Sequence, residues 1–120
     1  GQTHGGIAQG VGQAMWENCT IDTDTGQPLA GSLMDYGMPR SDNLPSFQCE
    51  IAEVLSPTNP LGIKAGGEGG TTPALATVVL AVLDALQEFG VKDIEMPVTP
   101  NAIWRAVHAA QCATDISSKG

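Results

Sequence analysis

The apolar positions near the start of the chain follow the spacing of a helix. In residues 5–17, Ile7, Val11, Ala14 and Met15 recur at intervals close to one helical turn. Four glycines in the same stretch weaken an isolated helix, and they also allow a second backbone to approach closely. We therefore expect a helix here that packs tightly against another element.

Two further helices are predicted in the second half of the chain. Residues 74–83 are apolar on almost every side, which is typical of a buried helix. A Thr-Pro pair at residues 72–73 indicates its start, and Gly90 indicates its end. A second Thr-Pro pair at residues 99–100 predicts the start of a last helix, which we expect to continue to about Ala110.

Alternation and turn signals predict strands between these helices. Residues 47–55 alternate between apolar and polar side chains, and residues 91–96 form a second short strand pattern before Pro97. The sequence Thr-Asp-Thr-Gly between residues 19–22 and 27–33 predicts the turn of a hairpin. This order of elements predicts an α+β fold, in which helices pack on a small mixed or antiparallel sheet.

Length and charge narrow the classes of protein that fit. The 120 residues suit one domain, which we place at residues 1–112, followed by a disordered tail at 113–120. The net charge of −8 disfavours nucleic acid and anionic membranes as partners. The longest unbroken apolar run, residues 78–83, is shorter than the roughly 20 residues of a membrane span. No signal-peptide pattern opens the chain, so we expect a cytoplasmic protein.

The cysteines and histidines indicate no metal or disulfide site. Cys19, Cys49 and Cys112 are odd in number and widely spaced, so we expect reduced thiols partly in the core. His4 and His108 lack the spacing of metal ligands, and we expect no metal held by protein side chains.

One glycine-rich stretch carries candidate chemistry. In residues 61–72, LGIKAGGEGGTT, the single acid Glu68 is flanked by Gly66, Gly67, Gly69 and Gly70. A carboxylate on a loop that leads into an apolar helix is a candidate general base, and free N–H groups at a helix start favour anions. A phosphate-binding loop is excluded because Lys64 precedes the glycines. A flexible surface loop with an incidental glutamate remains the alternative.

Four ordered blocks resemble a known family. They read GQTHGGIAQGVGQAMWE, DTGQPLAGSLMDYGMPRSDNLP, SPTNPLGIKAGGEGGTTPA and DIEMPVTPNAIWRA. Together they resemble the C-terminal end of the molybdenum-binding large subunit of the molybdenum hydroxylases, the family of xanthine dehydrogenase, aldehyde oxidase and aerobic carbon monoxide dehydrogenase. The resemblance extends from Gly1 to about Ala110. The family's large subunit is several times longer, so we expect a fragment of it.

The resemblance implies roles for particular residues. Glu68 matches the family's acid beside molybdenum, which implies that it is the general base that activates the attacking hydroxyl and helps to orient the substrate. Gln2 matches a glutamine that hydrogen-bonds the molybdopterin. The resemblance also implies that the glycines on either side of Glu68 let the chain lie close to the cofactor; these are Gly66, Gly67, Gly69 and Gly70.

The resemblance further implies a complete enzyme that oxidises an aldehyde, a nitrogen heterocycle or carbon monoxide with oxygen from water. Its cofactor is expected to be molybdopterin in the cytosine dinucleotide form. Its expected partners are the upstream part of the large subunit, an FAD subunit and a [2Fe–2S] subunit. The isolated chain is expected to bind no cofactor, to be inactive and to form a homo-oligomer through exposed apolar surface. The alternative is a non-catalytic, self-associating packing or assembly module from a truncated gene.

Overall fold

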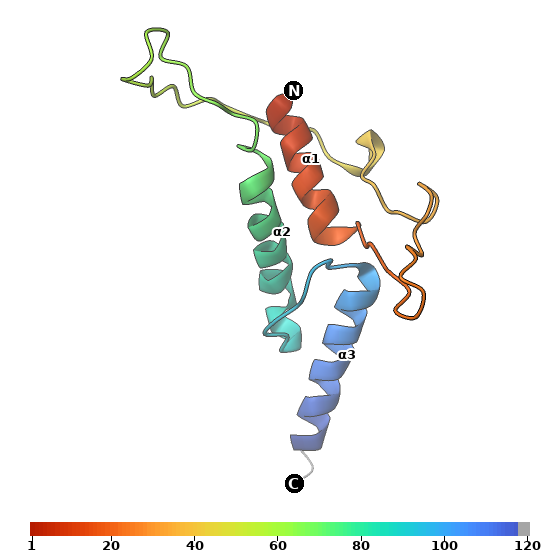
Figure 1. The fold of residues 1–120 in the computed structure, drawn as a ribbon. Helices are drawn as coiled ribbons and strands as arrows, with labels where there is room; N and C mark the ends of the chain where they lie inside the picture. The colour runs from red at the N-terminus through yellow and green to blue at the C-terminus, as the bar shows by residue number, and fades with distance from the viewer. Residues whose placement is uncertain (118–120) are drawn as a thin grey trace.

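The computed structural model describes the backbone of residues 1–117 and the side chains of residues 1–113. Within these residues the elements are α1 (Gln2–Met15), the 3-10 helix η1 (Ser41–Asn43), α2 (Thr71–Leu86), the 3-10 helix η2 (Gln87–Phe89) and α3 (Pro100–Ser117). Helices α1 and α2 lie side by side and run in the same direction, and α3 leads away from the end of α1 (Figure 1).

Glycines bring α1 and α2 close together. A methyl group placed on Gly10 would lie 2.6 Å from the Cβ of Ala74 and 2.9 Å from the carbonyl oxygen of Thr71. One placed on Gly6 would lie 3.1 Å from the Thr71 nitrogen. Only the absence of a side chain therefore permits this separation of the helices. The tight packing predicted for the glycine-rich helix is confirmed.

The buried core is small and is formed by residues of α1, of α2 and of the segment between α2 and α3. Its apolar members are Ala14, Ala74, Leu86, Val91 and Val98. Val98 is fully buried, and its backbone N–H donates to the carbonyl of Ala14 at 2.6 Å, which joins the end of α1 to the segment before α3. The radius of gyration is 19.3 Å, against about 14 Å for a compact chain of this length. Most of the chain between α1 and α2 lies away from this core.

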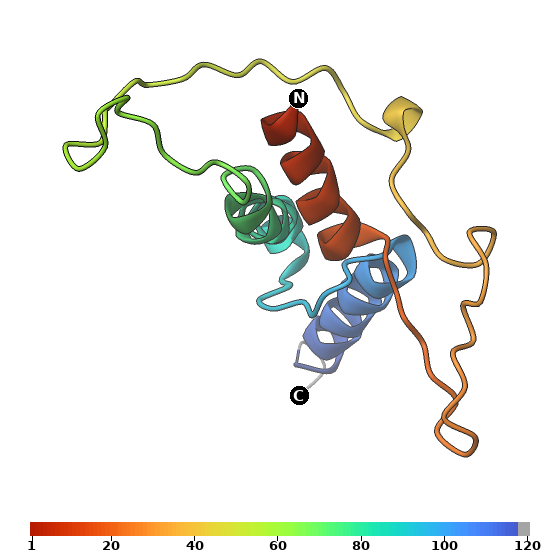
Figure 2. The same ribbon diagram turned by 45° about the horizontal axis from the view of Figure 1, so that its top comes forward.

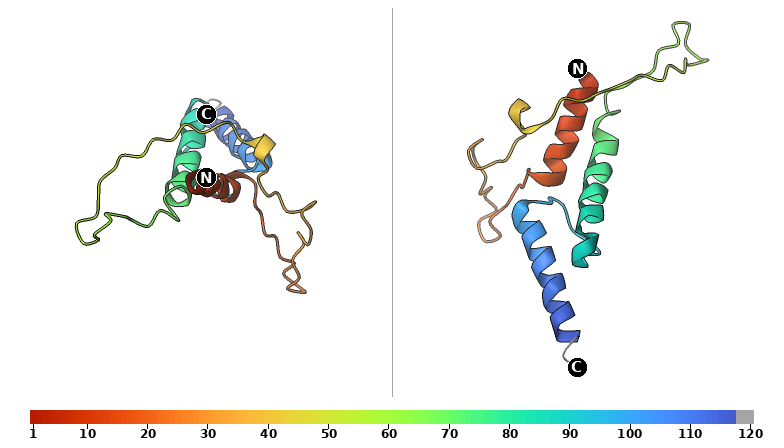
Figure 3. Two further views of the ribbon diagram at one scale, coloured as in Figure 1. Left: turned by 90° about the horizontal axis from the view of Figure 1, so that it is seen from above. Right: turned by 180° about the vertical axis from the view of Figure 1, so that it is seen from behind.

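Long loops on two sides of the helices account for the open shape. The loop after α1 and the loop that precedes α2 extend in different directions, with only η1 as regular structure between them (Figures 2 and 3). Large apolar side chains on these loops face outward. The exposed fractions are 90% for Met34, 87% for Ile51 and 77% for Leu61.

The predicted α+β fold is wrong, because residues 1–117 contain helices and no strands. Where a hairpin was predicted, the chain reverses through a turn, and one isolated bridge joins Ile21 to Pro28. Residues 47–55 and 91–96, both predicted as strands, pair with no other segment of the described chain. A strand is stable only when a neighbour accepts and donates its backbone hydrogen bonds, and here no neighbour lies beside them.

The helix signals were more accurate than the strand signals. Gly90 has φ +78° and follows η2, as its predicted stop position requires. The Thr99 hydroxyl accepts a hydrogen bond from the Ala102 N–H at 3.2 Å, which confirms the predicted cap. Helix α2 begins at Thr71 after Gly70, so the predicted cap Thr72 already lies inside the helix.

Two predicted helix ends also differ from the structure. Helix α1 begins at Gln2, three residues before the predicted start. Helix α3 continues to Ser117, past the predicted end at Ala110. Residues 118–120 of the predicted tail lie outside the described residues.

Two expectations about burial are also corrected. All three cysteines are exposed, so the expectation that they lie partly in the core is wrong. By length and composition alone, Thr71–Phe89 would suffice to cross a membrane, although its longest unbroken apolar run is short. Only 11% of this apolar stretch is buried in the chain. The same composition is typical of a core helix in a larger protein, so the finding is weak evidence for a membrane span.

Candidate active-site loop

A tight loop leads directly into α2, and we call it the glutamate loop. It consists of Gly66, Gly67, Glu68, Gly69 and Gly70. Inside it, the Gly69 N–H donates to the Gly66 carbonyl at 3.4 Å. The Glu68 carbonyl accepts from the Thr72 N–H at 3.2 Å, so the backbone of Glu68 closes the first turn of the helix. Its carboxylate is exposed and has no hydrogen-bond partner among the described residues. The carboxylate is therefore accessible to an incoming molecule.

Gln2 lies beside this loop, although 65 residues separate it from Gly67. The Gln2 side-chain Nε2 donates to the Gly67 carbonyl at 3.2 Å. The contact forms because Gln2 opens α1 while the glutamate loop opens α2, and the two helices start at the same end of the pair (Figure 1). Two candidates predicted separately from the sequence thus lie together in space.

Gly70 attaches the end of the glutamate loop to α1. It is buried, and a methyl group there would lie 2.5 Å from the Thr3 carbonyl oxygen and 2.9 Å from the Ile7 nitrogen. Backbone atoms cannot move aside as a flexible side chain can, so this close approach requires glycine. The predicted role of Gly70 was close approach to a cofactor; the contact the structure shows is with α1.

The N-terminal end of the glutamate loop, at Gly66 and Gly67, is not covered by other parts of the described chain. A methyl group on Gly66 or Gly67 would meet nothing within 4 Å. Within the described chain, the backbone N–H groups of Gly66, Gly67 and Glu68 donate to no acceptor. Free N–H groups next to a helix N-terminus are suited to bind an anionic group.

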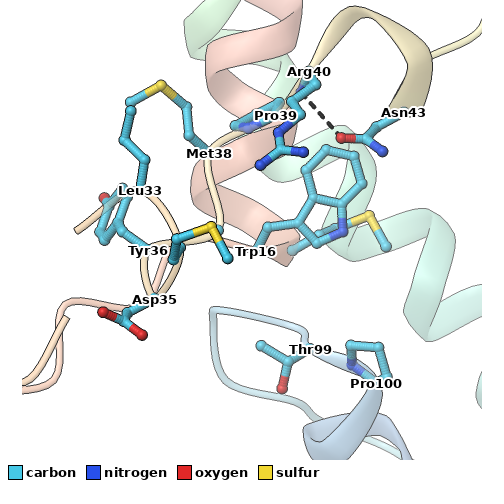
Figure 4. A pocket seen from close by; sticks show the side chains of 13 residues that line it. Trp16, Leu33, Asp35, Tyr36, Met38, Pro39, Arg40, Asn43, Thr99 and Pro100 are labelled. Carbon is cyan, nitrogen blue, oxygen red and sulfur yellow. Dashed lines mark hydrogen bonds between the residues drawn. The ribbon is translucent and has the colours of Figure 1, made fainter.

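A second concave site lies at the opposite end of α1, and the sequence did not predict it. An open cavity of about 580 Å³ is lined by the end of α1, residues 33–43 and the start of α3 (Figure 4). Trp16 and three methionines line it, namely Met15, Met34 and Met38. Helix α1 is about 20 Å long at its usual rise, so this cavity is distant from the glutamate loop. The only signal in the sequence was a tryptophan and methionines near an irregular loop.

Hydrogen bonds hold the segment around this cavity. The Tyr36 hydroxyl donates to the Glu17 carboxylate at 2.7 Å, and this bond raises the pKa of Tyr36 because it stabilises the protonated phenol. The Arg40 backbone N–H donates to the Asn43 side-chain oxygen at 3.0 Å, shown dashed in Figure 4. No cluster of three or more His, Cys, Asp or Glu side chains suited to a metal occurs in the described residues.

Comparison with known proteins identifies the family. A family model described as the molybdopterin cofactor-binding domain matches residues 1–45. The gamma subunit of the 6-hydroxypseudooxynicotine dehydrogenase complex of Paenarthrobacter nicotinovorans is 39% identical over 87% of this chain and 13% of that protein. The carbon monoxide dehydrogenase large chain of Hydrogenophaga pseudoflava is 32% identical over 89% of this chain and 13% of that protein.

A solved structure of similar fold and sequence supports the same family. The crystal structure of quinoline 2-oxidoreductase from Pseudomonas putida 86 is 40% identical, with a TM-score of 0.83 over 89% of this chain and 14% of that one. The chain therefore spans about one seventh of the length of the proteins it matches. It belongs to the molybdenum hydroxylase family, as a segment of the molybdenum-binding large subunit.

Proposed function

We propose that this segment supplies the general base, Glu68, to a molybdenum hydroxylase that oxidises its substrate with oxygen from water. The contact between Gln2 and Gly67 carries the proposal, because it places two residues with family-implied roles at one end of the helix pair. When bound, the molybdopterin centre supplies the two-electron oxidation of the substrate. The Glu68 carboxylate, exposed and without a hydrogen-bond partner in the described chain, accepts the proton that the attacking oxygen loses.

The residues around Glu68 have the polar groups that a pterin cofactor requires. The Gly66, Gly67 and Glu68 N–H groups are free to donate to its oxygen atoms. Gln2 uses Nε2 on Gly67, and its Oε1 remains free to accept from a pterin N–H. The open space at Gly66 and Gly67 leaves room for a ring system against the backbone. We propose the cytosine dinucleotide form of molybdopterin as the cofactor.

The exposed apolar surface supports a place within a larger subunit. Loop residues such as Ile51 and Leu61 are more than three-quarters exposed, and α2 is apolar but mostly uncovered. Neighbouring segments of the large subunit would remove this surface from water. We propose that the rest of the large subunit covers these loops, and that FAD and [2Fe–2S] subunits complete the enzyme. The printed name of the Paenarthrobacter relative, a subunit of a complex, supports a multi-subunit assembly.

We propose a nitrogen heterocycle as the substrate class. Identity is 40% to quinoline 2-oxidoreductase and 32% to the carbon monoxide dehydrogenase large chain. Quinoline is a nitrogen heterocycle, and the higher identity supports this class over carbon monoxide. Turnover of quinoline with no turnover of carbon monoxide, measured on the complete enzyme, is the expected result.

The role of Glu68 is tested by Glu68→Gln in the complete enzyme. Glutamine keeps the size of the side chain but cannot accept the proton, so turnover is expected to fall about 10²–10⁴-fold. Molybdenum content is expected to stay the same. Glu95→Gln is the matched control, because Glu95 is also exposed and lies outside the glutamate loop. Turnover near the unmodified level in Glu68→Gln would contradict the assignment.

A further inference from the structure

Glu68 lies between two points at which the glutamate loop touches α1. On its C-terminal side, buried Gly70 packs against the backbone of Thr3 and Ile7. On its N-terminal side, the Gly67 carbonyl accepts the hydrogen bond from Gln2 Nε2 at 3.2 Å. Both contacts are made by the first two turns of α1, so this helix end holds the loop on either side of the glutamate.

The two contacts differ in how strongly each depends on a single side chain. The Gly70 contact is extensive packing between backbones and depends on no single side chain. The N-terminal side has nothing comparable, because neither Gly66 nor Gly67 has a neighbour within 4 Å of the place where a Cβ would lie. Apart from the hydrogen bond from the Gly69 N–H to the Gly66 carbonyl inside the loop, only Gln2 restrains the N-terminal side of the glutamate loop among the described residues.

We infer that Gln2 is the positioning residue for Glu68. Its amide holds the Gly67 carbonyl and thereby sets the direction from which the next residue, Glu68, presents its carboxylate. A general base works only within hydrogen-bond reach of the proton that it takes, so a small rotation at Gly67 is costly to turnover. This inference rests on the proposed role of Glu68 and adds a second role to Gln2, beyond the predicted contact with the cofactor.

The inference is tested in the complete enzyme with two variants and a matched control. Gln2→Ala removes the side chain, and Gln2→Glu keeps its size but replaces the donor with an acceptor. Gln13→Ala is the control, because Gln13 is an exposed glutamine on the same helix with no hydrogen bond among the described residues. Hydrogen exchange measured by mass spectrometry reports on residues 66–70, and molybdenum content is measured alongside.

Exchange of the Gly69 amide, whose N–H donates to the Gly66 carbonyl inside the glutamate loop, is expected to rise about two- to tenfold in both Gln2 variants, which corresponds to the loss of one hydrogen bond. In Gln13→Ala it is expected to remain unchanged. Turnover in Gln2→Ala is expected to fall about 10- to 100-fold with little change in KM, as for a misplaced catalytic group. Combined with Glu68→Gln, the Gln2→Ala change is expected to lower turnover much less than it does alone, because the part of its effect that acts through Glu68 is already lost.

Unchanged exchange at residues 66–70 in both Gln2 variants would overturn the inference. So would an equal loss of turnover from Gln2→Ala in the presence and absence of Glu68, since that pattern indicates an effect on the cofactor alone. Failure of the proposed function is a separate result. It would show as full turnover in Glu68→Gln, while the exchange measurement still reports whether Gln2 restrains the loop.

Discussion

Replacing Gly10 with alanine tests the packing on which the position of the glutamate loop depends. Gly10 lies in the middle of α1, where its Cα faces the start of α2. An alanine Cβ would lie 2.6 Å from the Ala74 Cβ, whereas two carbon atoms in comfortable contact lie about 3.5–4.0 Å apart. The helices would have to separate by about 1 Å to relieve this contact.

Two opposing terms decide the size of the effect. Alanine favours a helix over glycine by about 1 kcal/mol, which raises the free energy of unfolding. Overpacking of a close contact costs about 1–3 kcal/mol, and here the second neighbour is the Thr71 carbonyl oxygen, which belongs to a helix and cannot rotate away. We therefore expect Gly10→Ala to lower the free energy of unfolding by up to about 2 kcal/mol.

Gly5→Ala provides the control. Gly5 is in the same helix and is exposed, and a methyl group there would meet nothing within 4 Å. It keeps the helix gain without the clash, so we expect it to raise the free energy of unfolding by about 0.8–1 kcal/mol. Urea unfolding followed by far-UV circular dichroism, at one fixed protein concentration, measures both variants. If Gly10→Ala stabilised the chain as much as Gly5→Ala, the close approach of α1 and α2 would be refuted.

Three further results are expected. The Asp22 carboxylate accepts hydrogen bonds from the Thr25 N–H, the Thr25 hydroxyl and the Asp24 N–H, and these hold its pKa below the ordinary 3.8. Because this pKa is lowered, the hydrogen bonds of the Asp22 carboxylate stabilise the turn above pH 3.8, and this stabilisation is lost as the pH falls through the pKa of Asp22 in the folded chain. An NMR titration of the Thr25 amide with a midpoint at or above pH 3.8 would contradict this. Gly90→Ala is expected to cost about 1–2 kcal/mol in urea unfolding because φ there is +78°, and Gly90→Asn less; equal stability of all three would disprove a left-handed residue. Sedimentation velocity of the isolated chain at micromolar concentration in about 0.15 M salt is expected to show a dimer or larger species, and a stable monomer would show that the exposed apolar loops do not associate.

The glutamate loop shows how far sequence reasoning reached at the site. Glycines around a single acid, directly before a helix start, predicted Glu68 as the candidate base, and the loop and helix do lie in that order. The opening glutamine was found through family resemblance. Neither pattern predicted the hydrogen bond between Gln2 and Gly67. These residues are 65 positions apart in the sequence, and their contact depends on how α1 and α2 pack. The cavity beside Trp16 was missed for the same reason, since its lining comes from three separate segments.

The sequence by itself determined the features that depend on a few adjacent residues. The left-handed stop at Gly90, the Thr99 cap and the three α-helices of the described residues all follow from local backbone preferences, which operate within one or two turns. Only the tertiary structure decided whether residues 47–55 become a strand. Their alternating pattern describes a segment suited to a sheet, but a strand forms only when a neighbouring strand supplies hydrogen-bond partners, and the described chain has none.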